Sequence, residues 1–190
     1  MIGGSMLKHR FKLAVTACAA MAALGAAATS AVAADQTAIA RGKYLVIVAG
    51  CSDCHTPGSL LGKPDMARFL GGSDVGFAIP GLGVFPGRNL TPDKETGLGG
   101  WTTKQIITAF TTGVRPDGRI LAPIMPWEAL GKLTKSDALA IALYLKSLKP
   151  VKNAVPGPFG PSETPTTFVM TAMPGSVYVS LPKPGGPPPK

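Results

Sequence analysis

The sequence has 190 residues, with 19 Lys and Arg against 10 Asp and Glu, so its formal net charge is +9. The basic residues are scattered singly rather than gathered into a stripe, which gives no support for nucleic-acid binding. With three cysteines and two histidines in all, the chain is also poor in ligands for a four-coordinate zinc site.

Residues 1–33 have the layout of a secretory signal peptide. A basic run from residue 8 to 12 precedes an apolar, Ala-rich stretch at 13–28, and Ala31 to Ala33 form a small-residue cleavage site. We therefore expect a mature periplasmic protein that begins at about residue 34. Lipidation at Cys18 is a minor alternative, because the apolar stretch continues beyond this cysteine.

Removal of this leader takes away three basic and no acidic residues, so the formal charge of the mature chain is +6. A mildly basic surface suits an acidic docking partner, and an ordinary solvated surface explains it equally well.

From about residue 36 to 49 the apolar residues follow a pattern compatible with an amphipathic helix. The β-branched residues make a strand a fair competitor, but the motif that follows needs a tight turn directly after this segment. Gly42 costs about 1 kcal/mol relative to Ala inside a helix, so it predicts the close approach of another helix.

Cys51, Ser52, Asp53, Cys54 and His55 match the C-x-x-C-H pattern of covalent haem attachment. The two thiols can add to the two vinyl groups of one haem, and the histidine then binds the iron as proximal ligand. A thioredoxin-like dithiol would need a neighbouring βαβ pattern, which the flanks do not show. The two cysteines could also bind zinc, for which the chain lacks further ligands, or form a structural disulfide.

Residues 56–100 contain five prolines and many glycines, so no long element is expected there. Irregular chain of this length in a compact domain favours wrapping around a cofactor. Two helices follow. For the first helix, Thr102 with Gln105 predicts a capped start, and Gly113 predicts the end. For the last helix, Thr134 with Asp137 predicts the start, and the helix stops before residue 150.

The segment 151–190 holds ten of the 19 prolines, so we interpret it as an extended tail with one short strand at 177–181. Disorder or loose packing is expected slightly ahead of a docking arm that lies on a partner.

His55 is the only histidine after the leader, so a second histidine ligand is excluded and methionine, lysine, an amine terminus or an empty site remain for the sixth position. Met125 is best placed among the methionines because Pro123 and Pro126 stiffen the chain around it and Pro126 favours an extended conformation. Met66, Met170 and Met173 are worse placed.

Several polar side chains are candidates to hold the haem propionates or the loop around them. They are Arg88, Asn89, Trp101, Arg115, Arg119 and Trp127.

The segments CSDCH, NLTPDKETGLGGW, TTGVRPDGR, LAPIMPW and LTKSDALAIALYLKSL resemble class I c-type cytochromes, over about residues 37–155. More narrowly, they are similar to the haem domains of cytochrome subunits of membrane-bound alcohol, aldehyde and gluconate dehydrogenases. The resemblance implies an all-α bundle around haem c, with the first and last helices crossing so that Gly42 lies near Tyr144. It implies His55 as proximal and Met125 as distal iron ligand. Those subunits typically carry several haem domains, whereas this sequence has one haem motif.

We therefore predict three parts: a signal peptide at 1–33, a cytochrome c domain at 34–150 and a Pro/Gly-rich tail at 151–190. The predicted function is periplasmic electron transfer in a respiratory chain, without catalysis of its own, through one covalent haem c. The expected redox partners are a dehydrogenase, a quinone-linked complex or a terminal oxidase, with membrane association only through a partner or through Cys18. A different hypothesis is a haem with an open sixth site that binds a gas or performs peroxide chemistry.

Overall fold

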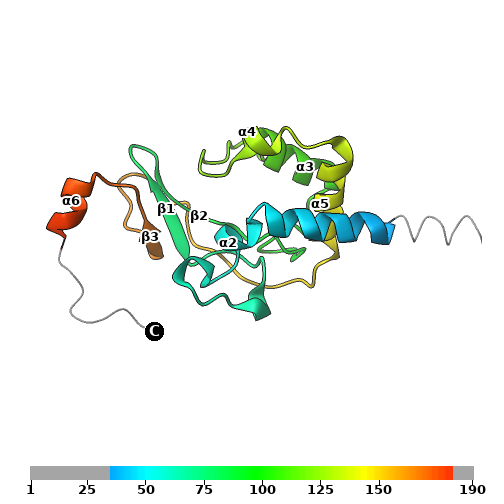
Figure 1. Cartoon of the computed structure of the whole chain (residues 1–190), viewed down its shortest axis with the longest axis horizontal. Helices are drawn as coiled ribbons and strands as arrows, with labels where there is room; N and C mark the ends of the chain where they lie inside the picture. The colour runs from blue at the N-terminus through cyan, green and yellow to red at the C-terminus, as the bar shows by residue number, and fades with distance from the viewer. Residues whose placement is uncertain (1–34, 182–190) are drawn as a thin grey trace, which may run out of the picture.

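The computed structural model describes residues 35–181, so the predicted signal peptide, its cleavage site and Cys18 lie outside the described residues. The described chain forms a helical body with a small three-stranded sheet on one side (Figure 1). The prediction of a helical body is confirmed, but the predicted all-α fold class does not include the sheet. Between residues 35 and 181, no helix has the length and apolar character needed to cross a membrane.

The described residues begin with a helix at 35–48, which we call the N-terminal helix. The remaining helices and strands follow in chain order: α2 (Cys51–His55), two 3-10 turns η1 (Ser59–Leu61) and η2 (Met66–Arg68), β1 (Val75–Ile79), β2 (Gly83–Pro86), α3 (Thr103–Thr112), α4 (Trp127–Leu130), α5 (Lys135–Ser147), β3 (Phe168–Met170) and α6 (Gly175–Ser180).

The N-terminal helix crosses α5 at Gly42 (Figure 1). A Cβ atom on Gly42 would overlap the carbonyl oxygen of Ala140 and lie 2.8 Å from the Cβ of Tyr144. The predicted approach of Tyr144 to Gly42 is therefore confirmed. The core is formed where these two helices meet α3, and it includes Leu45, Val46, Ile106, Phe110, Ile141, Tyr144 and Leu145.

Both predicted helix starts are confirmed. The Thr102 hydroxyl accepts a hydrogen bond from the Gln105 N–H, and the Gln105 side chain accepts one from the Thr102 N–H, which completes a capping box. At α5, the Thr134 hydroxyl accepts from the Asp137 N–H. Helix α3 ends at Gly113, whose φ of 76° suits glycine.

The sheet has the strand order β2-β1-β3. Strands β1 and β2 form an antiparallel hairpin, in which the Leu82 N–H donates to the Ile79 carbonyl, and β3 pairs with β1 in parallel. The signal for the hairpin was present in the sequence, because two apolar runs flank Pro80 and Gly81. The interpretation of 56–100 as irregular missed it.

The tail differs most from its prediction. Phe159 pairs with Val84 on the outer edge of β2, and β3 adds to the outer edge of β1, so the tail contacts the hairpin on both sides. Residues 151–170 are therefore packed on the body rather than loose, whereas 171–181 are exposed throughout.

The predicted strand at 177–181 is wrong, because the chain forms α6 over most of this range. Strand propensity is realised only beside a neighbouring strand, and nothing in the described chain pairs with these residues. Instead, the Pro174 carbonyl accepts from the N–H groups of Val177 and Tyr178, which starts a short helix. In Figure 1, α6 stands clear of the rest of the described chain.

Candidate functional site

The C-x-x-C-H motif forms its own short helix, α2. Gly50, with a φ of 65°, separates α2 from the N-terminal helix, and its carbonyl accepts from the Asp53 N–H at 3.1 Å. Residues three apart lie on one face of a helix, so the turn presents Cys51 and Cys54 together. Both cysteines are free thiols, and burial raises the pKa of each. The two thiols therefore do not form a disulfide in this structure.

His55 follows the two thiols and is held in one orientation. Its side chain is buried, and its Nδ1 lies 2.7 Å from the carbonyl oxygen of Arg88. A carbonyl can only accept, so Nδ1 carries the proton and Nε2 keeps its lone pair. Burial lowers the pKa of His55, and the hydrogen bond to Arg88 opposes this shift only in part. The ring is thus neutral and suited to bind a metal through Nε2.

Two segments hold α2 from outside. The Gly72 N–H donates to the His55 carbonyl at 2.8 Å. A Cβ on Gly87 would overlap the Cys54 carbonyl oxygen and lie 3.3 Å from the His55 Nδ1. Glycine at 87 therefore allows the Arg88 carbonyl to reach the histidine. Neither role was predicted from the sequence.

The side chains of Arg88 and Asn89 were predicted to hold either the propionates or the loop around them, and in this structure both bond to other segments of the chain. The Arg88 Nη1 donates to the carbonyls of Val155, Pro156 and Gly157 at 2.7, 3.1 and 2.9 Å. The Asn89 Nδ2 donates to the Thr96 hydroxyl and the Val151 carbonyl, and its Oδ1 accepts from the N–H and hydroxyl of Thr91.

Positive charge gathers near Arg88 nevertheless. Burial lowers the pKa of Arg88, and repulsion from Arg119 and Arg115 lowers it further, so the three guanidinium groups lie within electrostatic range of one another. Arg115 and Arg119 come from one turn, in which the Arg115 N–H donates to the Arg119 carbonyl at 3.0 Å. Asp117 is the carboxylate that contacts these two arginines. This excess of positive charge suits the two carboxylates of a haem.

The other predicted residues lie around α3 and α4. The Trp101 ring lies under the Arg115 guanidinium, at 5.1 Å from its centroid. Trp127 packs against Gly113, where a Cβ would overlap its indole ring. Met125 packs against the core, and its N–H donates to the Ala122 carbonyl at 3.0 Å, which closes a turn just before it.

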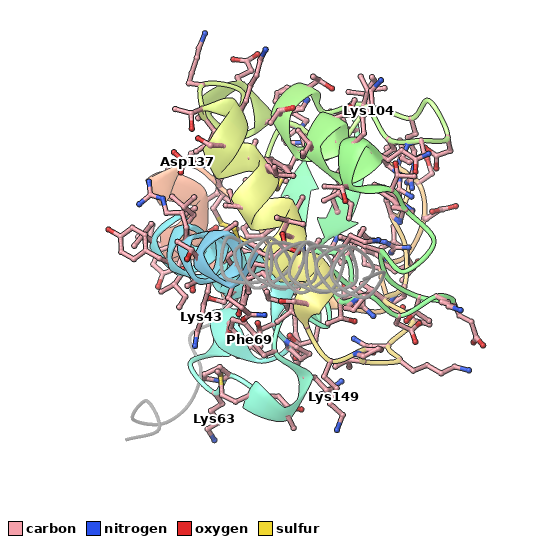
Figure 2. All side chains as sticks on the ribbon, turned by 90° about the vertical axis from the view of Figure 1, so that its right-hand side faces the viewer. Lys43, Lys63, Phe69, Lys104, Asp137 and Lys149 are labelled. Atoms are coloured by element: carbon pink, nitrogen blue, oxygen red, sulfur yellow. The ribbon has the colours of Figure 1, made fainter. Side chains whose placement is uncertain are left out.

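Between residues 35 and 181, no group of three or more His, Cys, Asp or Glu side chains is placed to hold a metal ion. Lys104 projects at the top of Figure 2, whereas Lys63 and Lys149 project at the bottom, so these three lysines do not lie together.

Two free thiols and a carbonyl-oriented imidazole on one helical turn, beside crossed helices, define a protein built to carry covalent haem. The sequence model of the Cytochrome c family matches residues 39–149, and the chain belongs to this family. Membership implies haem c and makes electron transfer the class of activity.

Several relatives of this chain are cytochrome subunits of dehydrogenases. It is 37% identical to the fructose dehydrogenase cytochrome subunit of Gluconobacter japonicus over 133 residues. The aligned region covers 66% of this chain and 26% of the relative. It is 33% identical over 148 residues to the cytochrome c subunit of the quinone alcohol dehydrogenase of Gluconobacter oxydans (strain 621H). This alignment covers 77% of this chain and 29% of the relative. For the gluconate 2-dehydrogenase cytochrome c subunit of Pantoea cypripedii, the identity is 32% over 135 residues. This alignment covers 69% of this chain and 29% of the relative. The chain thus spans under a third of the length of these relatives.

Proposed function

We propose that this protein is an exported, single-haem electron carrier that accepts electrons from a periplasmic dehydrogenase, as its subunit or its partner. The observation that carries the proposal is the α2 turn, where Cys51 and Cys54 precede His55, whose Nδ1 is fixed by the Arg88 carbonyl. When bound, haem c would cycle between ferrous and ferric iron and pass one electron at a time.

Met125 is the proposed distal ligand. Met66, Met170 and Met173 expose 64%, 40% and 38% of their surface, whereas Met125 packs against the hydrophobic core. A thioether that is already half-buried against the core and follows a closed turn would need little further ordering to reach an iron atom. Methionine opposite histidine raises the reduction potential, as suits an electron acceptor.

The chain's own residues supply ligation, charge and exclusion of water. Arg88, Arg115 and Arg119 would neutralise the propionates, and Trp101 and Trp127 would cover the edge of the ring. Two carboxylates beside three guanidinium groups are favourable in a partly buried setting.

The proposed partner follows from the relatives, which are cytochrome subunits of fructose, alcohol and gluconate dehydrogenases. Electrons would leave toward a quinone-linked complex or a terminal oxidase. The predicted signal peptide supports a periplasmic site, where haem attachment through thiols takes place in an exported chain.

The absorption spectrum of the purified protein tests the haem assignment. We expect a low-spin spectrum with a sulfur-to-iron band in the ferric form, lost in Met125→Ala and kept in the matched control Met66→Ala. A high-spin spectrum with rapid carbon monoxide binding in the unmodified protein would instead support the open-site hypothesis. A colourless protein would contradict both.

Co-purification from membranes tests the partner. We expect a dehydrogenase to accompany the full chain and to reduce its haem when its substrate is added. Recovery of the cytochrome alone, unreduced by any membrane dehydrogenase, would contradict the proposed partner without affecting the haem assignment.

A further inference from the structure

We propose that residues 151–157, which we call the tail brace, position the proximal histidine by fixing Gly72 and Arg88, the two residues to which His55 is hydrogen-bonded. The inference rests on the proposed role of His55 as an iron ligand. It assigns a function to residues that follow the region matched by the family model, because that region ends at residue 149.

His55 makes one hydrogen bond through its ring and one through its carbonyl. The ring Nδ1 donates to the Arg88 carbonyl at 2.7 Å, and the backbone carbonyl accepts from the Gly72 N–H at 2.8 Å. The positions of Arg88 and Gly72 therefore determine how the imidazole is turned.

The tail brace contacts both of these residues. Three of its carbonyls, from Val155 to Gly157, accept from the Arg88 Nη1. The Val155 side chain lies against Gly72, where a Cβ would overlap it, and Val155 is only 8% exposed. One short segment thus covers both hydrogen-bond partners of the histidine.

The tail brace is itself anchored at its start, so it can transmit a constraint. The Val151 N–H donates to the Thr91 hydroxyl at 3.0 Å, and its carbonyl accepts from the Asn89 Nδ2 at 2.7 Å. The Asn153 Nδ2 donates to the Gly71 carbonyl at 2.8 Å. These bonds join the tail brace to residues 89–91, next to Arg88, and to Gly71, next to Gly72.

A hydrogen bond from the second nitrogen of a ligand histidine makes that ligand a stronger donor to the metal. A stronger donor stabilises the ferric state and lowers the reduction potential. Loosening the tail brace should therefore weaken the Nδ1–H bond, speed its hydrogen exchange and raise the reduction potential.

The test uses Arg88→Lys in the full-length haem protein. Lysine keeps the positive charge, but its amine ends one bond short of the Nη1 position, so the three carbonyl contacts lengthen. The sequence has only two histidines, His9 and His55, so selective ¹⁵N-histidine labelling identifies the His55 Nδ1–H by NMR in the ferrous protein. We expect its exchange to accelerate about five- to tenfold, the equivalent of one buried hydrogen bond, and the potential to rise.

A second variant guards against a local folding defect at Arg88. Asn153→Ala removes the bond to Gly71 without touching Arg88 and should shift both measurements in the same direction by less. The matched control is Arg41→Lys, which makes the same substitution at an exposed residue whose side chain pairs with Asp137 and not with the tail brace.

Unchanged Nδ1–H exchange and potential in both Arg88→Lys and Asn153→Ala, in protein that keeps its low-spin spectrum, would overturn this inference and leave the proposed function standing. An equal response in Arg41→Lys would also overturn it, since the cause would then be a general effect of the arginine-to-lysine substitution and not the loss of the tail-brace contacts. A colourless unmodified protein would overturn the inference together with the proposed function.

Discussion

The helical side and the loop side of this protein are held together by different interactions. Where the N-terminal helix, α3 and α5 meet, the buried residues are apolar. By contrast, every buried polar residue identified in the described chain falls between residues 55 and 91, namely His55, Thr56, Ser73, Asn89 and Thr91. The helical side relies on apolar packing, and the loop side relies on side chains that bond to the backbone of distant segments.

The difference fits the division of labour in an electron carrier. Apolar packing tolerates moderate substitution of similar volume, so the helices provide stability without strict requirements on single atoms. A ligand histidine needs one orientation, and only directional hydrogen bonds, such as that between His55 and the Arg88 carbonyl, give it. The proposed ligand His55 thus lies on the polar side of the protein.

The largest effect is expected at the helix crossing, from Gly42→Ala. Alanine ordinarily stabilises a helix interior by about 1 kcal/mol over glycine, but here the added methyl would overlap the Ala140 carbonyl. We expect a loss of about 3 kcal/mol in the free energy of unfolding, measured with urea by circular dichroism. Gly100→Ala, where a Cβ meets nothing within 4 Å, is the control and should change little. If Gly42→Ala left the free energy of unfolding unchanged, the two helices would be able to move apart at no cost.

A smaller loss is expected on the loop side, from Asn89→Ala. Asn89 is 2% exposed, and both ends of its amide are bonded, so alanine leaves the buried Thr91 N–H and the Val151 carbonyl without these partners. We expect a cost of about 2 kcal/mol by the same urea measurement.

Gln105→Ala provides the comparison from the helical side. It removes a side chain that also bonds the backbone, but at an exposed helix start, and should cost about 1 kcal/mol or less. Equal losses in Asn89→Ala and Gln105→Ala would remove the distinction between the two sides.

The same division decides what could be predicted from the sequence. The starts of α3 and α5 were correct because Thr102 and Thr134 act on residues three positions away, and Gly42 was informative because its cost inside a helix demands a neighbour. The haem motif is equally local.

The loop side could not be predicted in this way because its contacts are distant and use backbone atoms. His55 bonds a carbonyl 33 residues away, and Arg88 bonds carbonyls up to 69 residues away. Every residue type has a carbonyl, so no pattern of residue types identifies which one is used. Prolines in 151–170 suggested a loose chain, yet proline keeps its carbonyl as an acceptor, and Pro156 uses it.

The smallest effect expected is on acid stability, through Asp93. Its carboxylate accepts hydrogen bonds from the Thr96 hydroxyl and N–H and from the Glu95 N–H, and these bonds lower its pKa. A carboxyl whose pKa is lower in the folded state stabilises the fold above its unfolded pKa of about 4, and this contribution is lost as the pH falls through the folded value.

The Thr96 hydroxyl also accepts from the Asn89 Nδ2 and from the Asn153 N–H, so acid should loosen the link between the Asp93 loop and the tail. We expect Asp93→Asn to be less stable than the unmodified protein at pH 7 and the difference to shrink between about pH 5 and pH 2, followed by urea unfolding at each pH. A difference that stays constant across this range would mean that the charge of Asp93 does not contribute, and that the loop side is held by neutral hydrogen bonds alone.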